Sequence, residues 1–110
     1  MLTIGGSRVR VYVCREATDM RCSFRGLSGK VRSVLKEDPL SGHLFCFMNR
    51  RKNYVKLLYW DRSGYCIWSK KLTRGTFYLP SMTEITIDNL SQILSGHKPK
   101  NNKQHLDFMR

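Results

Sequence analysis

Acidic residues are scarce in this chain of 110 residues, which has 8 aspartates and glutamates against 20 lysines and arginines. Metal-dependent catalysis needs carboxylates within a few ångströms of one another. The carboxylates worth considering are Asp19, Asp61 and Glu84, and each has a local explanation, as a helix cap, a turn former and the start of a strand. A Gly-rich phosphate loop and a Ser/His/Asp pattern are also absent. The sequence therefore predicts no catalytic residue and no enzyme.

Long hydrophobic runs are missing as well. No apolar stretch approaches the length of a membrane span, and residues 1–6 lack the basic start and apolar core of a signal peptide. The hydrophobic fraction of 41% is nevertheless close to that of ordinary globular proteins. We therefore expect a cytoplasmic protein without a membrane partner, and leave association with the nucleoid open.

Closely spaced cysteine pairs do not occur. The four cysteines are dispersed, and Cys46 and Cys66 lie inside hydrophobic runs. Without a secretion signal they are expected to be reduced thiols. Their spacing, even with His43 added, does not suggest zinc ligation. The sequence predicts no metal and no cofactor.

Positive charge is what the chain has in excess, with a formal net charge of +12. This charge is large for one small domain. It points first to nucleic acid as the partner, and second to an acidic membrane surface or an acidic protein.

Residues 42–80 organise the chain. Four runs rich in aromatic and β-branched residues are separated by short polar breaks at 49–53, 61–64 and 73–75. Such spacing is typical of an antiparallel meander, because breaks this short cannot carry parallel crossovers. Both faces of 44–48 are apolar, so this run is expected to be an interior strand that is covered on both sides.

Alternate turns of a meander lie at the same end of the sheet, so the breaks at 49–53 and 73–75 are expected to lie together. That end would gather Arg50, Arg51, Lys52, Lys70, Lys71 and Arg74. A polyanionic partner would offset the repulsion between these charges. The alternative is that exposed turns simply favour charged residues. Aromatic residues between Tyr54 and Tyr78 interleave with further cations such as Lys56. Base stacking is one use of that mixture, and core packing is the commoner one.

A helix is predicted to start at Thr18 or Asp19 and to carry an apolar stripe from Met20 to Leu35. Beside the stripe, four basic residues share one narrow sector: Arg21, Arg25, Arg32 and Lys36. Such a row can follow a phosphate backbone or can be an ordinary solvated face. Gly26 and Gly29 suggest close approach by a partner, a kink in the helix, or a helix that ends early.

The remaining segments flank this core. Residues 8–14 alternate as a half-buried strand. Residues 84–87 form a short strand, and Asp88 caps a helix that ends at Gly96. Residues 1–96 thus form a single domain, and 97–110 are expected to be a basic, flexible tail.

These features carry a resemblance to a known family. The shared motif residues are Thr18-Asp19-Met20-Arg21, Phe24, Gly26, Leu27, Asp38-Pro39, Ser41-Gly42-His43-Leu44-Phe45, Phe47, Asn49-Arg50-Arg51, Lys56, Trp60-Asp61, Gly64, Lys71-Leu72, Gly75, Phe77 and Pro80. The chain resembles, from about Arg8 to Gly96, the small accessory protein, often called TnpB, of the insertion-sequence sixty-six type. The resemblance implies a protein that acts beside a separate transposase in DNA transposition, and it implies no particular molecular activity.

The sequence thus predicts an α+β domain with an antiparallel β-meander of about five strands, one principal helix packed on it and a short C-terminal helix. The predicted function is non-catalytic assistance to transposition. The protein is expected to bind DNA, either at the ends of the element or non-specifically, through the basic end of the sheet. The predicted DNA-binding residues are Arg21, Arg25, Arg32, Arg50, Arg51, Lys52, Lys56, Lys70, Lys71 and Arg74. The alternative is an interaction module that binds the element-encoded transposase or self-associates without touching DNA.

Overall fold

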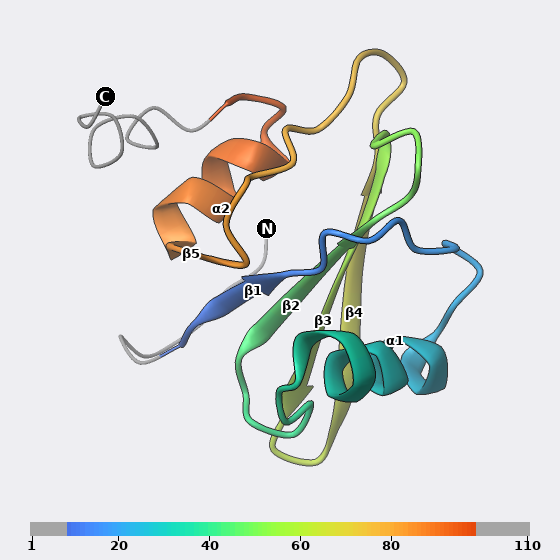
Figure 1. Ribbon diagram of the computed structural model, residues 1–110, viewed down its shortest axis with the longest axis vertical. Coiled ribbons are helices and arrows are strands. Elements are labelled where there is room, and N and C mark those ends of the chain that lie inside the picture. The colour runs from blue at the N-terminus through green and yellow to red at the C-terminus, as the bar shows by residue number, and fades with distance from the viewer. Residues whose placement is uncertain (1–8, 99–110) are drawn as a thin grey trace.

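Five strands form one sheet in the order β4-β3-β2-β1-β5 (Figure 1). The structure is a computed structural model that describes residues 9–98. Its elements are β1 (Val11–Val13), α1 (Phe24–Lys30), the π-helical segment η1 (Val31–Leu35), β2 (Leu44–Met48), β3 (Tyr54–Asp61), β4 (Gly64–Lys71), β5 (Glu84–Ile85) and α2 (Ile87–Leu94). The predicted α+β class, with one principal helix and a short C-terminal helix, is confirmed.

One strand pair departs from the antiparallel expectation. β2, β3 and β4 form consecutive antiparallel hairpins, and β5 pairs antiparallel with β1. β1, however, runs parallel to β2, with Val11 opposite Leu44 and Val13 opposite Cys46. The parallel pair is joined through α1 and η1, because parallel strands need a long crossover connection. The ends of β1 and β2 consequently lie side by side at one end of the sheet.

The meander itself contains three strands and not four. The segment after Gly75 was predicted to be its fourth strand, but residues 76–80 are not part of the sheet. Phe77 explains the difference, because its side chain is 1% exposed and lies in the core against α2. The chain therefore leaves the sheet at Leu72 and crosses one of its faces.

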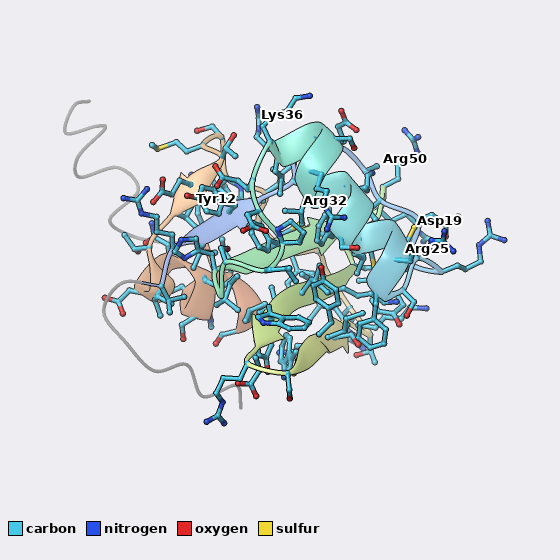
Figure 2. The ribbon with its side chains drawn as sticks, turned by 90° about the horizontal axis from the view of Figure 1, so that it is seen from below. Tyr12, Asp19, Arg25, Arg32, Lys36 and Arg50 are labelled. Atoms are coloured by element: carbon cyan, nitrogen blue, oxygen red, sulfur yellow. The ribbon has the colours of Figure 1, made fainter. Side chains whose placement is uncertain are left out.

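Both faces of β2 are buried, as predicted, and each belongs to a separate core. Leu44, Cys46 and Met48 pack with α2 on one face. Phe45 and Phe47 pack with α1 and η1 on the other face. Figure 2 shows α1 and α2 on opposite sides of the sheet. The second face of β2 is thus covered by α2, while β1 extends the sheet in its own plane.

β1 was predicted to be half-buried, and this was wrong. Val11 and Val13 are buried in the α2-side core, and Tyr12 is buried in the α1-side core. β1 lies between β2 and β5, so elements on both sides of the sheet cover it. Arg8, predicted for this strand, lies outside the described residues.

The principal helix begins later than predicted. Thr18 does not start it, because the Thr18 backbone N–H donates to the carbonyl of Met48 and holds the chain along β2. Asp19 does not cap it either, because its carboxylate accepts from the backbone N–H of Arg21, 2.8 Å away, in an isolated turn. The helix begins at Phe24, and Leu27 and Val31 form its buried stripe.

The C-terminal helix is capped by Thr86 and not by Asp88. The Thr86 hydroxyl accepts a hydrogen bond from the backbone N–H of Asn89, 3.0 Å away, and Asp88 lies in the first turn. Gly96 follows the helix with φ +88°, a conformation that favours glycine. Of the predicted flexible tail, residues 99–110 lie outside the described part of the chain. None of the helices in residues 9–98 has the length and apolar character that a membrane crossing requires.

Candidate nucleic-acid interface

The turn between β2 and β3 is held rigid by the side chain of Asn49. Its amide oxygen accepts from the backbone N–H groups of Asn53 and Tyr54 at 3.0 and 3.1 Å, and its amide nitrogen donates to the side chain of Asn53 at 2.7 Å. The turn is closed further by the Lys52 N–H, which donates to the Asn49 carbonyl. Arg50 and Arg51 form the exposed tip of this turn. Two arginines are therefore presented from a fixed backbone.

The loop after β4 lies against the same turn, as the sequence predicted. The Leu72 N–H donates to the carbonyl of Asn53, and the Phe77 N–H donates to the carbonyl of Lys52. These two bonds bracket residues 73–76, which are exposed and include Arg74. Arg74 is therefore carried at the same end of the sheet as Arg50 and Arg51.

A fourth arginine at this end was missed by sequence reasoning. Because β1 is parallel to β2, the residues after β1 lie beside the β2–β3 turn, and Arg15 lines a small cleft with Arg50 and Lys52. A second, wider cleft of about 650 Å³ lies between 17–20 and 49–51. Figure 2 shows Asp19 and Arg50, which line this wider cleft, on the same side of the molecule. The position of Arg15 beside this turn could have been predicted only from the parallel direction of β1.

We call Arg15, Arg50, Arg51 and Arg74 the turn cluster. All four side chains are exposed, and none has a hydrogen-bond or ion-pair partner within residues 9–98. Two predicted neighbours are placed differently. Lys52 is half-buried with φ +59°, and the Lys71 ammonium lies over the ring of Tyr54, 5.7 Å from its centroid. The turn cluster is thus the unpaired part of the predicted basic end.

Two predicted DNA-binding lysines are bonded inside the fold. The Lys56 ammonium donates to the carbonyl of Cys22 at 2.9 Å and ties β3 to the segment before α1. The Lys70 ammonium donates to the carbonyl of Leu94 at 2.8 Å, at the end of α2. Lys70 and Lys71 point to opposite faces of β4, because successive side chains of a strand alternate. The predicted cluster is therefore divided between the two faces of the sheet.

Arg21 does not belong to the basic row that was predicted on the helix. Arg21 precedes the helix and forms an ion pair with Asp19, with 2.7 Å between the guanidinium and the carboxylate. The hydrogen bonds from Arg21 lower the pKa of Asp19 to about 2. Arg25 in α1, Arg32 in η1 and Lys36 directly after η1 remain exposed and follow one another along this segment (Figure 2). We call these three residues the helix row.

The remaining candidate groups do not converge. Asp61 pairs with Arg62 at 3.4 Å and Glu84 with Arg10 at 3.8 Å, on separate elements. Across residues 9–98, no three His, Cys, Asp or Glu side chains come close enough to hold a metal ion. Burial raises the pKa of the Cys46 thiol to about 12. All four cysteines are free thiols.

Residues 9–104 match the protein family described as "IS66 Orf2 like protein". The chain belongs to this family. Its members are accessory proteins of insertion-sequence transposition and are not a known enzyme family, so the protein has an accessory role in transposition. The resemblance inferred from the motif residues is thereby confirmed.

Two relatives from Sinorhizobium fredii (strain NBRC 101917 / NGR234) are similar along most of their length. Uncharacterized protein y4hO is 41% identical over 95 residues, which cover 83% of each chain. Uncharacterized protein y4jC is 35% identical over 82 residues, which cover 74% of this chain and 70% of the relative. No solved structure matches the chain.

Proposed function

We propose that the protein assists transposition by binding the phosphate backbone of DNA through the turn cluster, with the helix row as a second contact. The observation that carries this proposal is the set of four exposed arginines without partners in residues 9–98, two of them on a turn that Asn49 holds rigid. Guanidinium groups bind phosphate in a bidentate geometry. A preorganised turn reduces the entropy that is lost on binding.

The proposed contact set excludes Arg21, Lys56 and Lys70. Each of these cations already donates to an oxygen of the protein, so a phosphate would have to displace that bond. Arg25 and Arg32 stay in the set because both side chains are exposed on one helix. A helix row of this kind can lie along a strand of phosphates, although it carries no base specificity.

Fluorescence anisotropy with labelled duplexes across a salt series tests the proposal. An element-end duplex is compared with a scrambled duplex of the same length. Each phosphate that an arginine neutralises contributes about 0.9 to the slope of log affinity against log salt. The double variant Arg50→Gln/Arg51→Gln should therefore make the slope shallower by about 2. Arg62→Gln removes an exposed arginine from the turn at the opposite end of β3 and should leave the slope unchanged.

Comparison of the two duplexes distinguishes DNA binding without sequence preference from binding that prefers the element end. Equal affinity for both means binding by backbone charge alone, and tighter binding of the element end adds sequence readout. Failure to bind either duplex at low salt contradicts the proposal. So does a double variant with the wild-type slope.

The second candidate function is contact with a protein partner, and the open edge of the sheet favours it. Within residues 9–98, β4 is a terminal strand of eight residues that pairs with β3 alone. A free edge can accept a strand from another chain, such as the transposase or a second copy. Co-purification with the transposase that survives nuclease treatment would support this function, and loss of the complex after nuclease treatment would contradict it.

A further inference from the structure

The ring of Tyr65 contacts two other aromatic rings near the surface of the molecule, those of Phe24 and Trp60. The ring of Phe24 is stacked on that of Tyr65, with centroids 6.4 Å apart and planes 20° apart. The ring of Trp60 meets Tyr65 edge-on, at 5.1 Å and 78°. We call Phe24, Tyr65 and Trp60 the ring cluster. It is built from α1, β3 and β4, and all three side chains lie on the α1 face of the sheet.

Core packing does not account for the ring cluster. Phe24 is 45% exposed, whereas the buried positions of the same helix are occupied by Leu27 and Val31. Tyr65 lies at the margin of the α1-side core, and neither Phe24 nor Trp60 belongs to either core. An exposed aromatic ring leaves apolar area in water, at a cost of roughly 25 cal/mol per Å². Part of the Phe24 ring is therefore accessible to a ligand.

Two exposed arginines are close to members of the ring cluster in the sequence. Arg25 follows Phe24 on the helix and is exposed. Arg62 follows Trp60 by two residues, and its side chain is 92% exposed. The acidic neighbour Asp61 already pairs with Arg62.

This combination of flat apolar rings and positive charge selects one class of ligand. A nucleic-acid strand with unpaired bases offers flat faces for stacking and phosphates for the cations. A duplex offers only phosphates and base edges in its grooves, because its bases are stacked on one another. An apolar surface of a second copy would bring the same excess of positive charge with it and would be repelled.

We propose that the ring cluster stacks an unpaired base of single-stranded DNA, while Arg25 contacts a neighbouring phosphate. This inference rests on the proposed DNA-binding function and adds a substrate class to it. The stacking contact and the duplex contact of the turn cluster use different residues, because the turn cluster lies at the opposite end of β3 from Trp60. Each contact can therefore fail independently of the other.

Tryptophan fluorescence provides a direct test. The chain has two tryptophans, and Trp68 lies on the other face of the sheet, at the margin of the α2-side core. In a Trp68→Phe background Trp60 reports alone. Oligothymidine of about 12 nucleotides, a length within the range that small domains bind, should quench Trp60, and a duplex of the same length should quench it less. Wild-type protein with a strand that contains 2-aminopurine gives the same readout should Trp68→Phe fold poorly.

A substitution at Phe24 completes the test. Phe24→Leu keeps an apolar side chain but removes the ring, and it should weaken single-strand affinity by about 5-fold or more while duplex affinity is unchanged. Leu40→Ala is the matched control, because Leu40 is 48% exposed in the turn before β2. It should leave both affinities unchanged.

Two results with Phe24→Leu would overturn the inference: a single-strand affinity equal to that of wild type, or a change in its sedimentation coefficient while single-strand binding is intact. The second of these would make the ring cluster a protein contact. An equal loss of single-strand affinity in Leu40→Ala would also overturn the inference. So would Trp60 fluorescence that is not quenched when single strands bind. None of the four affects the duplex contact, which is tested at Arg50 and Arg51. Loss of binding to single strands and duplexes alike would overturn both proposals.

Discussion

The ammonium group of Lys70 donates a hydrogen bond to the backbone carbonyl of Leu94, 2.8 Å away. This contact joins the edge strand β4 to the last turn of α2. Carbonyl groups at the end of a helix lack partners within the helix, and the helix dipole favours a cation there. The last turn of α2 contains no basic residue of its own. Lys70 therefore caps a helix from a distant strand, which gives it a structural role.

Lys70→Met should lower the free energy of unfolding by about 1.5 kcal/mol, the low end of the usual net value of a hydrogen bond that involves a charged group. It should leave the salt slope of DNA binding unchanged. Lys71→Met is the matched control, because the neighbouring side chain points to the opposite face of β4. It should cause little loss of stability, because no protein oxygen accepts a hydrogen bond from the Lys71 ammonium within residues 9–98. Urea unfolding and anisotropy measure the two effects. Equal loss of stability in both variants, or a lower salt slope in Lys70→Met, would contradict the assigned role of Lys70.

Asp19→Asn should strengthen duplex binding. The carboxylate of Asp19 holds the guanidinium of Arg21 and lines the wide cleft beside Arg50. The substitution removes a negative charge and frees the guanidinium of Arg21 to bind a phosphate. The slope of log affinity against log salt should therefore become steeper by about 1. Anisotropy at low salt measures the change, and an unaltered or weaker affinity would count against a DNA contact at this cleft.

The same substitution has a defined pH dependence. Because the pKa of Asp19 is lowered to about 2, its ion pair contributes stability above the ordinary carboxyl pKa of about 4 and loses it as pH falls through about 2. The affinity difference between wild type and Asp19→Asn should therefore stay constant from about pH 5 to 8. A difference that disappears within that range would show that Asp19 is not ionised as described.

The hairpins of this fold could be predicted from sequence because local patterns encode them. The breaks at 49–53 and 61–64 fall at the β2–β3 and β3–β4 turns as expected, and the two apolar faces of 44–48 placed β2 in the interior. The direction of β1 could not be predicted, because side-chain alternation is the same in parallel and antiparallel strands. The helix start was wrong because a hydrogen bond from Thr18 to Met48, 30 residues away, outweighed the capping preference.

The candidate site could be predicted only as a set of charges. Sequence reasoning placed Arg50, Arg51 and Arg74 at one end of the sheet, and the turn geometry brings them there. It could not separate free cations from bonded ones. Lys56 and Lys70 are bonded to carbonyls 34 and 24 residues away, contacts that exist only in the folded chain. Charge counts therefore overestimate a binding surface wherever lysines also cap or anchor elements.

Gly29→Ala should stabilise the protein by about 1 kcal/mol, the difference in helix propensity between the two residues. A Cβ at this position of α1 would meet nothing within 4 Å, and Gly29 does not have positive φ. Gly26→Ala is the informative comparison, because its Cβ would lie 3.2 Å from Cys22 and offset the gain. Thermal unfolding measures both variants. Lower stability of Gly29→Ala would show that α1 requires a glycine there.

The last prediction concerns pH and the thiol of Cys46. This thiol is buried beneath α2, and burial raises its pKa to about 12. In the unfolded chain it ionises near pH 8.5. Between these values the folded state binds more protons than the unfolded state, so stability is complete below about pH 8.5 and declines as pH rises.

The decline attributable to Cys46 should reach at most about 1.4 kcal/mol per pH unit. Cys46→Ala removes this ionisable group, so its unfolding free energy should fall less steeply than that of wild type between about pH 9 and 11. Urea unfolding of both proteins under reducing conditions measures the two slopes. The absolute stability of Cys46→Ala is lower because the substitution leaves a small cavity, and the comparison therefore rests on the slopes alone. Parallel slopes would mean that the thiol is accessible to water in the folded state, and that the core between β2 and α2 is less tightly closed than described.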